Sequence, residues 1–381
     1  MQRRSFIKLT ALSVAAIQAP IWITGCEAPQ AVSNWQGLGD HRFDPRYRAL
    51  TYGLLAPSSH NTQPWLVDLA DASIMRLFID PTRLLPAADT DQRQTWVSQG
   101  TFLEQLELGA ALEGLRADVT SLPEGDRRDA PVAAVQVAED SSIRPDPLAR
   151  LITARHSNKR VYDRGRALAP DAMHDLERLT DPASDLHIRA ITADDDLREV
   201  AEICTAGMDI EAGNAACAEE LSRWFRLGDQ AARRGDGFGL PQNGVTGIKR
   251  WIAEQFFIST DDIRDPESDF ARQGVDLARE QASSAPAFFA LVSGGNDRSS
   301  QLAAGRLYAR WQLTATGHGV GTHPMSQVLQ DLPGMSPLRR RLADVLGLND
   351  ESTVQMLVRA GYADPTTPSL RRPLAAIIRQ T

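Results

Sequence analysis

The sequence predicts an α+β protein made of two related halves, and three observations support this prediction. Segments with helical apolar periodicity are interspersed with short apolar runs that are typical of strands. A segment near residue 305 resembles one near residue 100 at matched positions. The 381 residues are 42% hydrophobic and 24% charged, which is typical of a globular enzyme with enough chain for one large domain or two ordinary ones.

The first 26 residues have the features of an export signal. Arg3 and Arg4 precede an apolar stretch that ends at Gly25, and paired arginines here indicate the twin-arginine route, with its translocase as a partner during export. Cys26 follows where the apolar stretch stops, as in a lipobox, and is the predicted site of lipid attachment. We therefore expect the protein on the periplasmic or cell-surface side, held to a membrane through lipid only.

Two alternatives for this leader remain open. An uncut membrane-spanning helix is disfavoured by Pro20 and by an apolar run at or below roughly 20 residues. A plain signal with a chance cysteine is the other alternative. Residues 27–40 are polar and are expected to act as a tether.

The first half, residues 41–147, is expected to contain two helices and several strands. A helix after Pro45 is stopped by the stretch from Ala56 to Ser59. A later segment has strong helical periodicity, with Trp96, Phe102 and Leu106 on its apolar face. The expected elements are helices at 45–55 and 95–115 and strands at 66–69, 73–79 and 132–137.

The second half, residues 148–381, repeats this mixture over a longer stretch. A pair of helices within 197–232 is expected to break near Gly213. The glycine-rich stretch 235–241 is predicted to be irregular, either as a lid over a ligand or as an exposed loop. The remaining expected elements are a helix at 303–316 and strands at 187–191, 287–292 and 353–358.

The internal repeat aligns residues 100–108 with residues 305–313. Gly100 then matches Gly305 and Leu108 matches Leu313, and two further identities follow at Ala110 with Ala315 and Gly114 with Gly319. Helices with the same apolar period match in this way by chance, so the repeat favours a duplicated α+β unit without establishing one.

Charge and cysteine content exclude several classes of function. A net charge of -8, with no basic stripe, argues against nucleic-acid binding. Beyond the leader only Cys204 and Cys217 remain, and neither cysteine nor histidine has the spacing of a metal site. These two cysteines either form a disulfide or pack as small side chains in helices.

Three segments combine polar side chains with rigid or glycine-rich backbone. Residues 57–65 place hydroxyls and amides between two prolines, which suits a planar polar ring. Residues 155–160, if extended, direct a guanidinium, a hydroxyl and an ammonium toward one dianion. Residues 317–327 carry glycines that let the backbone approach a ligand, without dinucleotide-site spacing. Taken singly, the first is better explained as a turn before a strand, with Trp65 as its first core residue, and the second is compatible with a solvated basic loop.

Taken together, these segments resemble the nitroreductase superfamily of FMN enzymes. The resemblance implies a three-layer fold with a mixed sheet flanked by helices, and FMN as the cofactor. The residues implied to bind it are Pro57, Ser58, Ser59 and Asn61 at the flavin ring, Arg155, His156, Ser157 and Lys159 at the phosphate, Pro324, Met325, Ser326 and Gln327 near flavin N5, and Arg371 or Arg372 at the phosphate.

The order of the motifs points to a fused form of this family. Members normally carry the phosphate stretch first and the Pro-Ser-Ser loop afterwards, and they form dimers with shared sites. Here the Pro-Ser-Ser loop lies in the first half and the phosphate stretch opens the second. The chain thus resembles the single-chain, Acg-like branch, in which a monomer acts as a pseudo-dimer with one FMN site.

The resemblance implies an oxidoreductase that reduces nitroaromatic, quinone-like or other conjugated acceptors through flavin N5. The acidic residue and glycine that family members carry near N5 are replaced by Ser326 and Gln327. No acid–base residue is assigned and the electron donor is open, because NAD(P)H is scarce outside the cytoplasm. The alternatives are a non-catalytic, flavin-sequestering lipoprotein and a scaffold that binds no flavin.

Overall fold

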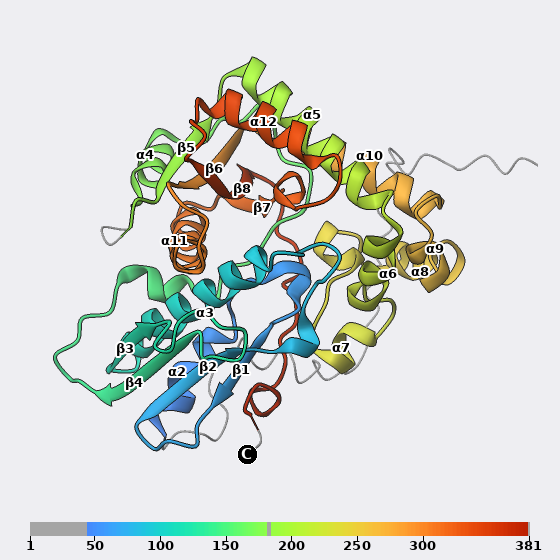
Figure 1. Cartoon of the computed structure of the whole chain (residues 1–381). Coiled ribbons are helices and arrows are strands. Elements are labelled where there is room, and N and C mark those ends of the chain that lie inside the picture. Colours follow the sequence, from blue (N-terminus) through green and yellow to red (C-terminus); the bar gives the residue numbers. More distant parts are fainter. Residues whose placement is uncertain (1–43, 181–183, 380–381) are drawn as a thin grey trace, which may run out of the picture.

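The computed structural model describes residues 44–180 and 184–379. The predictions for the signal at 1–26 and the tether at 27–40 lie outside these residues. Two four-stranded sheets, each with its own helices, stand one above the other in Figure 1. The predicted α+β class is confirmed.

The lower sheet in Figure 1 belongs to the first half and has the strand order β1-β2-β4-β3, with every neighbouring pair antiparallel. Strand β3 was not predicted, because the apolar periodicity of the long helix was extended to Leu115. Gly114, at φ +69°, ends that helix, and the next residues alternate between buried and exposed as a strand does. The elements are α2 (Pro45–Gly53), β1 (Trp65–Asp68), β2 (Ile74–Ile79), α3 (Arg93–Leu112), β3 (Leu115–Ser121) and β4 (Ala133–Glu139).

The upper sheet has the order β5-β6-β8-β7 and is antiparallel over its described pairs. Its central strand β6 is buried along its whole length, because α11 covers one face and α5 and α12 lie over the other. The elements are α4 (Pro170–Arg178), β5 (His187–Ile191), β6 (Ala287–Ser293), α11 (Arg298–Gly317), β7 (Gly321–Pro324), α12 (Met335–Leu346) and β8 (Thr353–Gly361).

A helical insertion separates β5 from β6 and forms the right flank in Figure 1. The predicted helix pair and its break at Gly213 are confirmed by α5 and α6. Cys204 in α5 and Cys217 in α6 are buried, with free thiols. The inserted helices are α5 (Asp194–Ala212), α6 (Ala215–Trp224), α7 (Gln230–Arg234), α8 (Gly247–Phe256), α9 (Thr260–Arg264) and α10 (Asp269–Ser283).

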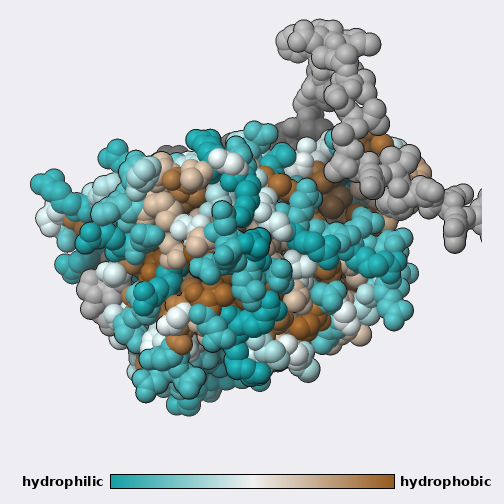
Figure 2. Space-filling view, turned by 90° about the horizontal axis from the view of Figure 1, so that it is seen from above, coloured by the Kyte–Doolittle hydropathy of each residue, from teal (hydrophilic) through white to brown (hydrophobic). Residues whose placement is uncertain are grey.

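Six short 3-10 turns complete the described elements, and one of them, η1, lies inside the Pro-Ser-Ser loop. Figure 2 views the molecule from the side of α5, α10 and α12, where hydrophilic residues surround smaller hydrophobic areas. Among residues 44–180 and 184–379, no helix combines the length and apolar character needed to cross a bilayer. The turns are η1 (Ser59–Asn61), η2 (Pro81–Arg83), η3 (Pro147–Leu151), η4 (Leu240–Asn243), η5 (Gln327–Leu329) and η6 (Leu374–Ala376).

The internal repeat corresponds to a physical contact between α3 and α11. Both helices have 20 residues, and each lies between the second and third strands of its own half. They pack so closely that a Cβ on Gly100 would lie 2.1 Å from the carbonyl oxygen of Leu302, and one on Gly305 2.0 Å from that of Val97. The aligned Leu108 and Leu313 share one apolar cluster. Residues at matched positions of the repeat therefore contact each other where α3 of the first half packs against α11 of the second.

The C-terminal segment leaves the second half and returns to the first (Figure 1). The amide of Val67 donates to the carbonyl of Ile377 at 2.7 Å, and the amide of Arg379 donates to that of Val67 at 2.8 Å. Val67 and Ile378 thereby form a parallel bridge beside β1. The described strand pairs of both sheets are antiparallel, whereas the resemblance implied a mixed sheet. The tail adds an isolated parallel bridge beside β1 and no further strand.

Candidate functional site

The loop between the two prolines, residues 57–64, has a strained backbone. His60, Asn61 and Gln63 adopt φ values of 49°, 52° and 53°. They are three of the five described non-glycine residues with positive φ. Such conformations cost on the order of 1–3 kcal/mol each and persist where the surroundings enforce them, often at functional sites.

Hydrogen bonds to the start of α3 and within the loop enforce this conformation. The hydroxyl of Ser58 accepts from the amide of Gln63 at 3.0 Å, and the hydroxyl of Ser59 donates to Gln94 Oε1 at 2.9 Å. Thr101 of α3 donates to the carbonyl of Pro57 at 2.7 Å. The hydroxyls predicted to face the flavin ring therefore also shape the loop.

The guanidinium of Arg155 lies at the centre of the site and is almost completely buried, with 2% of the residue exposed. It donates to Gln312 Oε1 and to the carbonyl of Leu55, each at 2.9 Å, and its Nε has no hydrogen-bond partner among the described residues. Burial lowers the pKa of Arg155 to about 10. A positive charge is thus held in the interior by neutral oxygens.

Arg371 brings a second buried guanidinium to the same place. It donates to the carbonyl of Leu55 at 3.0 Å, the same oxygen that Arg155 contacts, and to Asn61 Oδ1 at 3.1 Å. Burial, followed by repulsion from Arg155, lowers the pKa of Arg371 well below its usual range. The tail, the Pro-Ser-Ser loop and the phosphate stretch therefore meet at one point.

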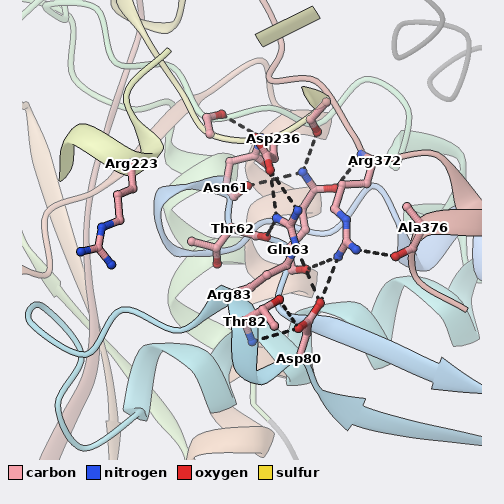
Figure 3. Close-up of polar contacts among 12 residues, drawn as sticks. Asn61, Thr62, Gln63, Asp80, Thr82, Arg83, Arg223, Asp236, Arg372 and Ala376 are labelled. Carbon is pink, nitrogen blue, oxygen red and sulfur yellow. Dashed lines mark hydrogen bonds and ion pairs between the residues drawn. The ribbon is translucent and has the colours of Figure 1, made fainter. Parts of the chain in front are cut away.

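Arg372, the alternative to Arg371 in the sequence analysis, is directed elsewhere (Figure 3). Its amide donates to Gln63 Oε1 at 2.8 Å and its guanidinium to the carbonyl of Gln63 at 3.2 Å. It also lies 3.7 Å from the carboxylate of Asp80. Of the two arginines, Arg371 is the one placed beside Arg155, while Arg372 fixes the loop to the edge of the first sheet.

Gln312 of α11 connects the residues of the phosphate stretch. Its Oε1 accepts from Arg155, and its Nε2 donates to Thr322 Oγ1 at 3.0 Å and to Ser157 Oγ at 3.4 Å. His156 stands outside this arrangement, with Nδ1 3.0 Å from the carbonyl of Ala154. The structure thus brings Arg155 and Ser157 together through a side chain that the sequence analysis did not identify.

Lys159 lies on another side of the site, where its ammonium stands 4.2 Å from the ring centroid of Phe238. Burial, with a further contribution from Arg359, lowers the pKa of Lys159 to about 8. Burial and the charge of Lys159 lower the pKa of His60 to about 4, so His60 is neutral at pH 7. His60 Nδ1 is buried without a hydrogen-bond partner among the described residues.

The glycine-rich stretch 235–241, predicted as a lid or a loop, lies against the Pro-Ser-Ser loop. Asn61 Nδ2 donates to the carbonyl of Gly237 at 2.9 Å, and Gln63 Nε2 donates to that of Gly235 at 2.8 Å. Phe238 contacts His60, with ring centroids 5.4 Å apart. The stretch is irregular up to the 3-10 turn that begins at Leu240, as the sequence predicts.

The residues predicted near flavin N5 begin with Pro324, the last residue of β7, and continue directly after the strand. The amide of Met325 donates to the carbonyl of Leu357 at 2.8 Å, and its side chain is buried in the core. Ser326 Oγ accepts from the Leu357 amide at 3.2 Å. Because Pro324 has no amide hydrogen and that of Met325 is engaged, Ser326 and Gln327 are the residues whose amides suit the predicted role.

Two surface cavities of about 620 and 410 Å³ lie away from these residues, one between α5 and α10 and one near the start of α3. None of the predicted site residues lines either cavity.

Comparison with known proteins places the chain near one group of enzymes. No family model matches it. The Mycobacterium tuberculosis protein named "Putative NAD(P)H nitroreductase Rv3131" is 26% identical over 340 residues, which cover 86% of this chain and 89% of that protein. "Putative NAD(P)H nitroreductase acg" from the same organism is 24% identical over 335 residues, covering 84% and 90%.

Solved structures of two nitroreductases align with part of the chain. The FMN-dependent nitroreductase NfnB from Mycobacterium smegmatis is 17% identical with a TM-score of 0.33, covering 56% of this chain and 86% of that one. The nitroreductase with bound FMN from Bacteroides fragilis is 14% identical with a TM-score of 0.34, covering 62% and 99%.

Proposed function

We propose that this protein is an FMN-binding oxidoreductase of the nitroreductase type, with one flavin site built between its two halves. Its substrates are nitroaromatic, quinone-like or other conjugated small molecules that accept electrons. The names of its relatives in Mycobacterium tuberculosis support this activity. The three motifs that the fold brings together support the cofactor.

The buried guanidinium of Arg155 is the single observation that carries the proposal. A buried charge without a paired countercharge costs several kcal/mol, so proteins retain one where a ligand supplies the opposite charge. Arg155 is held by neutral oxygens, its Nε has no partner among the residues that the structure describes, and Arg371 adds a second positive charge beside it. An anionic group such as a phosphate would offset the penalty, with the Nε–H of Arg155 as the donor open to it.

The residues around these arginines fit FMN. Arg155, Arg371, Ser157 and Lys159 would hold the phosphate, and the strained loop would place His60 and Asn61 at the ring. The buried Nδ1 of His60, which has no partner within the described part of the chain, is available to a heteroatom of a polar ring. A bound flavin supplies hydride and electron transfer, while the chain supplies orientation and electrostatics.

The proposal is tested by the visible spectrum of the purified chain. A yellow protein with stoichiometric FMN supports it, and a colourless protein that cannot be reconstituted with FMN refutes it. Measuring whether NADH, NADPH and a small chemical reductant each reduce the bound flavin then distinguishes an oxidoreductase from a flavin-sequestering protein. Nicotinamide cofactors are scarce outside the cytoplasm, so the physiological electron donor is not assumed to be one of them. The reductants that reduce the bound flavin will indicate its chemical class.

A second candidate, a flavin-sequestering protein, is favoured by one observation. The stretch from Gly235 to Phe238 is hydrogen-bonded to Asn61 and Gln63 and covers Lys159. A chain that keeps this contact with flavin bound would shield the cofactor from substrates. Reduction by the small reductant alone, with no reduction by either nicotinamide, is the result that favours it.

Export through the twin-arginine route and lipid attachment at Cys26 complete the proposal. The paired arginines and the cysteine at the end of the apolar stretch support it. Metabolic labelling with a fatty acid is expected to mark the wild type and to leave Cys26→Ser unlabelled. Equal labelling of both would show that this cysteine is not the anchor.

Replacing Gln312 by glutamate is expected to weaken FMN binding by about tenfold or more. The new carboxylate would lie one hydrogen bond from Arg155 and compete with the phosphate for its charge. The dissociation constant is measured by fluorescence titration of the apoprotein. Gln301→Glu, at a buried position near the start of the same helix, is the control and should bind FMN as the wild type does. Equal effects of the two changes would contradict the role of Gln312.

The affinity for FMN is expected to fall as pH rises above about 8. In the chain without flavin the pKa of Lys159 is lowered to about 8, and a phosphate raises it again. The ammonium of Lys159 therefore contributes fully to FMN binding below pH 8. Above pH 8 this contribution is lost, and the affinity for FMN falls by up to about tenfold per pH unit. Titrations from pH 7 to 9.5, where phosphate stays a dianion, measure this. Lys159→Met should give weaker binding without this slope.

A further inference from the structure

Helix α8 presents an apolar face to the solvent. Seven large hydrophobic side chains are exposed among the described residues, and five of them lie within or directly after this one helix. No residue of α8 is buried. The exposed fractions are 73% for Ile248, 56% for Trp251, 40% for Ile252, 68% for Phe256 and 55% for Phe257.

The orientation of the helix is the reverse of that in an ordinary surface helix. Ile248, Trp251 and Ile252 follow the spacing of a single helical face, which normally turns toward the core. Here the opposite face turns inward, where Arg250 and Glu254 form an ion pair at 2.7 Å. Glu254 also accepts from the amide of Gly228 at 3.1 Å. The ion pair and this contact fix the helix with its apolar side outward.

The composition of this face matches a helix that lies in a membrane interface. Trp251 and Phe256 contact each other edge to face at 5.8 Å, and Lys249 is an exposed basic residue of the same helix. Aromatic and branched apolar side chains bordered by a basic residue are typical of interfacial helices, which bury one face at the boundary of headgroups and acyl chains. An apolar patch of this kind marks a docking surface.

The predicted lipid at Cys26, and the length of chain between it and the described residues, make a membrane the occupant that this face can reach. Fully extended, the stretch from Cys26 to Asp44 reaches roughly 60 Å. A globular chain of this size has a radius of gyration of roughly 20 Å, so a lipid at Cys26 can hold any face of the protein against the bilayer. A diacylglycerol at Cys26 supplies two acyl chains that keep the chain on the membrane, and an interfacial helix would add a contact that fixes one face toward it.

We propose that α8 docks on the surface of the membrane to which Cys26 anchors the chain, through Ile248, Trp251, Ile252, Phe256 and Phe257. This goes beyond the flavin chemistry and rests on the membrane address proposed above. The docked helix would hold the protein in one orientation, whereas a lipid anchor alone leaves it free to rotate. The docking itself needs no lipid on the protein.

The test uses residues 27–381, which contain every described helix and strand and lack both the leader and the lipidation site. The chain is sedimented with sucrose-loaded vesicles of phosphatidylethanolamine and phosphatidylglycerol. The wild type should partition onto the vesicles, and the double variant Trp251→Ser/Phe256→Ser should bind at least tenfold less. Leu277→Ser, which changes an exposed side chain on α10, is the control and should bind as the wild type does. FMN content, measured on the same samples, should be equal in all three.

Two results would overturn the proposal. The first is absence of wild-type binding at any lipid concentration, and the second is equal binding by wild type and double variant. If the wild type instead forms dimers in solution that the double variant cannot form, and neither binds vesicles, the face belongs to a second copy of the chain. Vesicle binding is measured on protein without a lipid, and it does not depend on bound flavin. A negative result would therefore refute the docking of α8 without contradicting the proposed flavin chemistry or the proposed lipid attachment.

Discussion

Gly305→Ala is expected to lower the free energy of unfolding by about 4 kcal/mol or to prevent folding altogether. The added methyl group would lie 2.0 Å from the carbonyl oxygen of Val97 and 2.9 Å from the Cα of Gly100, where backbone atoms leave no flexible side chain to move aside. The two halves would have to separate along the α3–α11 packing. Chemical denaturation followed by circular dichroism measures the loss.

Gly274→Ala is the matched control for this prediction. Gly274 also lies inside a helix, α10, but its nearest neighbour for a new Cβ is Met208 Cε at 3.8 Å, an ordinary contact. Alanine should therefore stabilise the chain by about 0.5–1 kcal/mol through helix propensity. If both changes had the same small effect, close packing of the two glycines would not hold the halves together.

Arg155→Met is expected to weaken FMN binding by about 100-fold or more. Methionine fills similar apolar space, but it removes a buried positive charge that would form charge-assisted hydrogen bonds to the phosphate, worth about 1.5–3 kcal/mol each. The purified variant should be colourless, and titration of FMN into it should give a much larger dissociation constant.

Arg93→Met separates loss of binding from loss of stability. Arg93 is also buried and also donates to backbone carbonyls, at 2.7 Å to Gln355 and 2.7 Å to Leu329, but it lies near the start of α3, away from the phosphate stretch. Arg93→Met should lower the melting temperature about as much as Arg155→Met does, while FMN stays bound. Flavin lost equally from both variants would contradict the assignment of Arg155 to the phosphate.

The elements predicted well from the sequence are those determined by residues close to one another in the chain. The strand at 187–191 and the helix break at Gly213 were predicted where they occur, because apolar periodicity and glycine act within a few residues. Strand β7 (Gly321–Pro324) was missed, because it has no apolar alternation and exists through its pairing with β8. Helix α8 was also missed, although Ile248, Trp251 and Ile252 follow the spacing of one helical face.

The candidate site shows the same division. Arg155 and Asn61 stand in recognisable motifs, so the sequence identifies them. Gln312 reaches Arg155 across 157 positions of sequence, and nothing in its own helix indicates that contact. The choice between Arg371 and Arg372 likewise depends on which guanidinium turns toward Leu55, which only the path of the tail decides.

The return of the tail to β1 has a consequence for the timing of biosynthesis. The bridge between Val67 and Ile378 joins residues that lie 311 positions apart, because 378 minus 67 is 311. The edge of β1 is therefore covered only after the whole second half has been synthesised, however early the four strands of the first sheet emerge. Until then the first half carries an unpaired strand edge, which other chains can pair with.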